Sequence, residues 1–191
     1  MGLPITVTTA HPVHQVSSSA SGGAGWHWLQ RAAEMAAIAA GSGPLLSSAA
    51  ALGWTWLPRV AMRTPGLEPG SISAARKFAT TTLQRWGVPD READVAVVVS
   101  ELLSNAVRHA LPLAPNPPDR PIRLGLLHAG PSIMCAVADP SEQVPVPREP
   151  RWLEESGRGL HVIAALSDQW GSCPAPGQPG KVVWATFRTP R

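Results

Sequence analysis

Two polar residues one helical turn apart, Glu101 and Asn105, have the types and spacing that could do chemistry. They lie in the stretch VAVVVSELLSNAVRHA, residues 95–110, whose apolar residues recur at helical spacing. Side chains four residues apart project from one face of a helix. A carboxylate can accept a proton, and an amide oxygen can bind a hard cation. The pair therefore suits metal-assisted phosphate chemistry, although an amphipathic helix with a solvated polar face fits the same pattern.

A second acid, Asp139, follows the apolar run at residues 133–138. A carboxylate at the end of a buried strand needs a hydrogen-bond donor, and an exocyclic amine such as that of adenine would serve. The simpler alternative is an aspartate that opens a loop before Pro140.

A third segment, Gly157-Arg158-Gly159, opens a predicted helix at residues 160–168. Glycines let the backbone approach a ligand closely, and the free N–H groups of a helix start favour anions. Arg158 would add a charge-assisted contact to phosphate. Ordinary turn chemistry explains a lone G-x-G equally well, so the segment gains weight only beside the other two.

Taken in order, these segments resemble the motifs of a known superfamily. ELLSNAVRHA resembles the N box, VADPS the first glycine box and SGRGLHVI the second glycine box of the gyrase B, histidine kinase and MutL (GHKL) ATPases, which have the Bergerat fold. The resemblance covers roughly residues 55–188. It is closest to the small branch that contains the anti-sigma-factor serine/threonine kinases and their actinobacterial relatives.

The resemblance implies a role for each matching residue. Glu101 would be the general base, and Asn105 would hold the Mg²⁺ that bridges the phosphates of ATP. Asp139 would accept from the adenine amino group. The triphosphate would be lined by Gly157, Arg158, Gly159 and Leu160. His109 stands where the family often has a histidine, although a helix-end role explains it as well.

One position departs from the family pattern. The first glycine box usually has a glycine two residues after its acid, and here that residue is Ser141. A side chain at this position would narrow the adenine pocket or replace a backbone contact with a hydroxyl. The segment 144–150, rich in proline, falls in the region of the family's ATP lid.

The pattern of elements predicts an α+β fold, a two-layer sandwich with helices packed on one face of a mostly antiparallel sheet. We expect strands at 54–62, 122–127, 133–138 and 181–187, and helices at 74–87, 90–110 and 160–168. The ATPase-like domain would occupy residues 54–190. Residues 1–53, rich in Ser, Gly and Ala, would form a largely disordered extension with a short helix at 26–40.

Composition bounds the remaining possibilities. The net charge of +3 comes from scattered basic residues, so direct nucleic-acid binding is not expected. The weakly apolar stretch 35–57 contains Pro44 and does not favour a membrane span. Cys135 and Cys173 lack metal-ligand spacing, and no basic residue precedes an apolar signal segment, which favours a reduced, cytoplasmic protein.

Two functions follow from the resemblance, and both use ATP. One is a serine/threonine protein kinase that uses Mg-ATP to phosphorylate an anti-sigma-factor antagonist and also binds a sigma factor. The other is a non-catalytic switch in which ATP orders a partner-binding surface. A structural domain with a degenerate site is a third hypothesis. A histidine kinase fits less well, because no helix pair with a phosphoacceptor histidine precedes the domain. The expected partners are proteins, with a homodimer also considered.

Overall fold

In the part of the chain that the structure describes, the backbone forms one antiparallel sheet with helices on both faces. The computed structural model describes residues 7–9, 27–40, 59–66, 68, 70–110, 121–147 and 158–189. Neighbouring strands are all antiparallel, in the order β1-β2-β3-β4-β6-β5. The strands are β1 (Val7–Thr9), β2 (Arg59–Arg63), β3 (Arg123–Ala129), β4 (Ser132–Asp139), β5 (Gln169–Pro174) and β6 (Lys181–Arg188).

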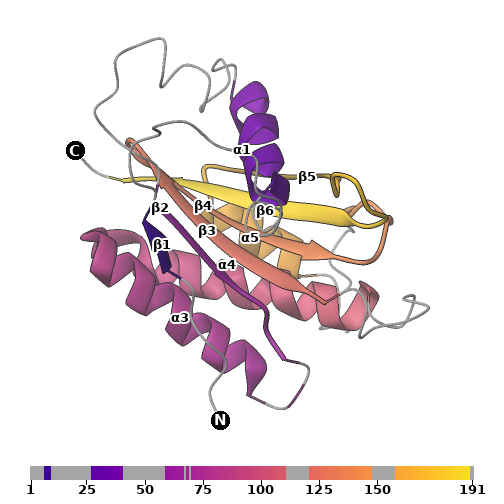
Figure 1. The fold of residues 1–191 in the computed structure, drawn as a ribbon, viewed down its shortest axis with the longest axis horizontal. Helices are drawn as coiled ribbons and strands as arrows, with labels where there is room; N and C mark the ends of the chain where they lie inside the picture. The colour runs from indigo at the N-terminus through magenta and orange to yellow at the C-terminus, as the bar shows by residue number, and fades with distance from the viewer. Residues whose placement is uncertain are drawn as a thin grey trace, which may run out of the picture.

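Three helices lie on one face of this sheet, α3 (Ser71–Trp86), α4 (Glu92–Asn105) and α5 (Gly159–Leu166). Figure 1 shows α3 and α4 side by side below the strands. The core between these layers is built from residues of all three helices and from alternate residues of the central strands, such as Val137 on β4 and Val183 on β6. Burial of this apolar surface is the main force that holds the helices on the sheet.

Helix α4 packs on the sheet through one face, because its apolar residues share that face. Its buried residues are Val95, Val98, Val99, Leu102 and Leu103. Glu101 and Asn105 are only partly buried, so they occupy the border between the core and solvent. A π-helical turn, Ala106–Ala110, follows Asn105 directly. Such turns widen a helix and often occur at functional sites.

Helix α1 (His27–Ala39) lies on the opposite face, above β6 in Figure 1. It forms a second core with Met134 and Ala136 of β4 and with Trp184 of β6. Small residues on its inner face, among them Ala32 and Ala36, allow this close packing. The folded part of the chain therefore includes α1, which lies before residue 54.

The α+β fold and the antiparallel sheet predicted from the sequence are confirmed. The helices α3, α4 and α5 share one face as expected, and α1 adds a third layer that the two-layer prediction lacked. The strand β5 begins at Gln169, where a loop was expected, and β1 was also missed. The disorder expected for residues 1–6, 10–26 and 41–53 lies outside the described residues. None of the helices in the described ranges has the length and apolar character to cross a bilayer.

A histidine near one end of the sheet lies partly buried beside an arginine. His128 pairs with Arg59 across β3 and β2, and its ring stacks on Trp86 with centroids 5.9 Å apart. Arg59 Nη1 donates to the backbone oxygen of Trp86 at 2.7 Å. Burial, and after it the charge of Arg59, lowers the pKa of His128 below its usual 6.5, while a backbone hydrogen bond at Gly130 acts in the opposite direction.

We expect the contribution of His128 to the free energy of unfolding to fall as the pH drops below about 6.5. In that range the unfolded chain takes up a proton on His128 more readily than the folded chain does, so protonation favours unfolding. Urea unfolding at several pH values would measure the effect, and His128→Gln should flatten the curve. His109→Gln, which changes an exposed histidine, should not. Equal slopes for the wild type and His128→Gln would contradict this assignment.

Candidate functional site

The N-terminal end of α5 meets the polar face of α4. A Cβ atom placed on Gly159 would lie 2.7 Å from Glu101 Oε2 and 3.4 Å from the amide oxygen and nitrogen of Asn105. The backbone of Gly159 therefore packs directly against both polar side chains. Since a larger residue would fill this space, the glycine lets the helix start, the carboxylate and the amide come together.

The other residues predicted around this point are placed as follows. Arg158 precedes α5 and is exposed, while the side chain of Leu160 packs partly into the core. Only the backbone of Leu160 is therefore suited to line a ligand. Gly157 lies outside the described residues. His109 is exposed in the π-helical turn beyond Asn105.

Asp139 lies at the end of β4, opposite Lys181 of β6 in the strand register. Its Oδ1 accepts from Lys181 Nζ at 2.9 Å and from the backbone N–H of Ser141 at 2.9 Å. Lys181 Nζ also donates to the backbone oxygen of Ser141 at 3.2 Å. Asp139 and Lys181 share the sheet face of Val137 and Val183, which is the face covered by α3, α4 and α5.

Burial dominates the electrostatics of this ion pair. The side chains of Asp139 and Lys181 are 3% and 11% exposed. Burial raises the pKa of the Asp139 carboxyl above its usual range, and this outweighs the lowering by Lys181 and by the N–H of Ser141. A carboxylate with such a cost of ionisation gains from further donors, which suits it to bind an amine.

Ser141, which stands where a glycine was expected, has a structural role. Its side chain is buried, and its Oγ accepts from the backbone N–H of Gln143 at 3.1 Å. The hydroxyl thus organises the chain that leaves β4, while the Ser141 backbone contacts both Asp139 and Lys181. A serine that turns its hydroxyl to the loop keeps the backbone contacts available in the same way as a glycine.

These residues fit a nucleotide and a magnesium ion. Asn105 offers an amide oxygen of the kind that can bind Mg²⁺, and Glu101 beside it offers a carboxylate that can accept a proton. Gly159 offers a helix start without a side chain beside them, which suits phosphate oxygens. Asp139 offers a buried acceptor for an amino group on the same side of the sheet. Within the described ranges, no three His, Cys, Asp or Glu residues cluster as a metal site.

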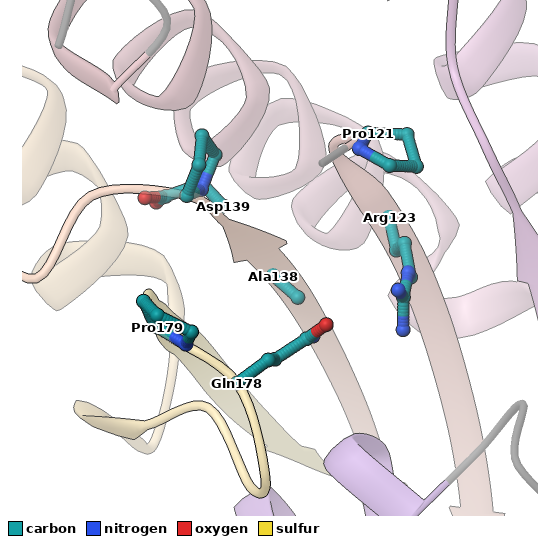
Figure 2. A pocket seen from close by; sticks show the side chains of 7 residues that line it. Pro121, Arg123, Ala138, Asp139, Gln178 and Pro179 are labelled. Carbon is teal, nitrogen blue, oxygen red and sulfur yellow. The ribbon is translucent and has the colours of Figure 1, made fainter. Parts of the chain in front are cut away.

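A small pocket lies at the end of β4, on the sheet face that carries α1. Figure 2 shows Arg123 and Gln178 approaching it from opposite walls, while the Asp139 carboxylate turns away from them. Arg123 pairs with Ala138, whose side chain belongs to the core under α1. The pocket therefore opens on the face opposite Glu101 and Asn105, and we do not assign the nucleotide to it.

Lys181 was not predicted as a site residue from the sequence. It was expected only as the first residue of a strand. Its signal in the sequence is that it is one of two lysines in the chain and the only charged residue between Asp168 and Arg188. Its partner could not be named without the register between β4 and β6.

Comparison with known proteins gives a match over the part of the chain that carries these residues. The family model of the histidine kinase-like ATPase domain matches residues 67–187, more than half of the chain. The match runs from just before α3 to the penultimate residue of β6, and so includes Glu101, Asn105, Asp139, Gly159 and Lys181. A search of curated proteins found no match.

Proposed function

The chain belongs to the histidine kinase-like ATPase domain family, whose members bind ATP, and from this premise we propose that it is a regulatory serine/threonine protein kinase. It would resemble the anti-sigma-factor kinases and phosphorylate an anti-sigma-factor antagonist. The observation that carries the proposal is the contact of Gly159 with both Glu101 and Asn105. The contact brings together a carboxylate that could accept a proton, an amide that could bind a cation and a helix start that could bind phosphate.

Each residue would have a distinct task in this reaction. Bound Mg-ATP supplies the phosphoryl group and the cation that neutralises its charge. Glu101 would accept the proton of the attacking serine or threonine hydroxyl through a carboxylate oxygen. Asn105 would hold the cation through its amide oxygen, and Asp139 would orient the adenine ring of the nucleotide. The main contribution of the protein is then positioning, together with electrostatic stabilisation.

A second candidate is a switch that binds ATP and transfers nothing. It is favoured by the Asp139 to Lys181 ion pair, which already satisfies one carboxylate oxygen of the residue expected to hold adenine. In this function ATP would stabilise one arrangement of the segment after β4, where Val144 and Val146 are exposed, and a protein partner would bind that arrangement. The sigma factor or its antagonist is the proposed partner in both cases.

Calorimetric titration of ATP with Mg²⁺ tests the site common to both candidates. We expect saturable binding by the wild type, and affinity about 10- to 100-fold weaker for Asn105→Ala, the range found when a group that supports a metal site is removed. The difference should shrink when Mg²⁺ is replaced by EDTA, because Asn105 would act through the cation. Gln84→Ala removes an exposed amide near the other end of α4 and should bind as the wild type does.

Two outcomes would count against this assignment. No binding of the wild type at millimolar ATP would overturn both candidate functions. Equal affinities for the wild type and Asn105→Ala in Mg²⁺ would remove Asn105 from the cation site.

A further inference from the structure

Lys181 is held in a fixed position beside Asp139. The preceding residue, Gly180, has φ +122° and packs so closely on the backbone oxygen of Asp139 that a side chain there would collide with it. The turn before β6 is therefore pressed against the end of β4. From this turn Lys181 extends over the sheet face that carries α3, α4 and α5, where its side chain is 11% exposed.

Among the described residues, the hydrogen bonds of the pair use two of the three donors of Lys181 and one of the two oxygens of Asp139. An ammonium group has three N–H donors, and two of those of Lys181 reach Asp139 Oδ1 and the backbone oxygen of Ser141. The carboxylate of Asp139 has two oxygens, and its hydrogen bonds to described residues both end on Oδ1. The strand ends thus present an acceptor and a cationic donor next to each other.

An adenine base has the complementary pattern on one edge. Its 6-amino group donates, and the adjacent ring nitrogen N1 accepts. On the basis of the proposed nucleotide site, we propose that Lys181 is a base-recognition residue that donates to adenine N1 while Asp139 accepts from the 6-amino group. Guanine has the reverse order, an acceptor at O6 and a donor at N1. Because Gly180 and Ser141 fix the order of the protein groups, the pair selects adenine over guanine.

A purely structural lysine would also hold Asp139 in place, so the test must address the atom on the base. The probes are ATP and 1-deaza-ATP, in which N1 is replaced by a C–H group, titrated with Mg²⁺ into the wild type and into Lys181→Met. We expect the wild type to bind ATP about 10- to 100-fold more tightly than 1-deaza-ATP, the range for a hydrogen bond to a charged group. Lys181→Met should bind the two nucleotides equally.

Two controls isolate the contact. Lys77→Met changes an exposed lysine on α3 and should keep the full preference for ATP. The analogue 7-deaza-ATP is altered on the other edge of the base, and the wild type should bind it as it binds ATP. An equal loss with 7-deaza-ATP would point to a general effect on the ring and would overturn the proposal.

The wild-type comparison needs no variant, so the proposal stays testable even if Lys181→Met folds poorly. If the wild type binds ATP and 1-deaza-ATP equally, Lys181 does not recognise N1, while the nucleotide site itself stands. A preference for ATP that persists in folded Lys181→Met would overturn the assignment of the contact to this residue. If the wild type binds neither nucleotide, the proposed function fails with it.

Discussion

Glu101→Gln is expected to keep nucleotide binding and to lose phosphoryl transfer by a factor of about 10² to 10⁴, the usual contribution of a general base. Glutamine has the shape of glutamate, so the contact with Gly159 can persist. It cannot accept a proton at neutral pH. The expected pattern is a large fall in the rate of transfer with little change in the affinity for ATP.

Single-turnover transfer from γ-labelled ATP to an anti-sigma-factor antagonist, with transfer to water measured in parallel, would test this. Glu92→Gln makes the same change at the start of α4, where Glu92 contacts Gln84, and should leave the rate unchanged. An unaltered rate in Glu101→Gln would exclude Glu101 as the base. Tight ATP binding without transfer in the wild type would contradict the kinase and favour the switch.

The parts of this site that sequence reasoning reaches are those carried by one element. The period of apolar residues along α4 predicts which face is buried, and Val95, Val99 and Leu102 are buried as expected. Because the same period places Glu101 beside Asn105, a local pattern was enough to find the pair. Gly159 was found in a similar way, from its place at a helix start.

Contacts between distant segments could not be predicted from the sequence. Asp139 and Lys181 are 42 residues apart in the sequence, and their ion pair depends on the register between β4 and β6. Local periodicity carries no information about that register. The strand β5 was missed because Gln169, Gly171 and Pro174 have weak strand propensities, and pairing with β6 overrides them. The place of α1 is likewise a tertiary result, since its alanines suit either face of a sheet.

We expect the loss of one partner of the buried ion pair between Asp139 and Lys181 to destabilise the fold. Asp139→Ala should lower the free energy of unfolding by about 3–5 kcal/mol, because it leaves the ammonium of Lys181 in a largely buried site without its anion. Chemical denaturation would measure the loss. Asp90→Ala, which removes an exposed carboxylate, should change stability by less than about 0.5 kcal/mol.

Replacing both partners separates stability from nucleotide binding. The double variant Asp139→Leu with Lys181→Met should recover most of the lost stability, since a buried ion pair exchanged for apolar groups of similar size is often neutral or better. It should not recover binding of ATP, because the acceptor for the amino group and the donor beside it are both gone. Recovery of stability together with full ATP affinity would show that the pair serves the fold alone. Failure to recover stability would mean that the bonds from Ser141 also depend on the pair, since that residue contacts both partners.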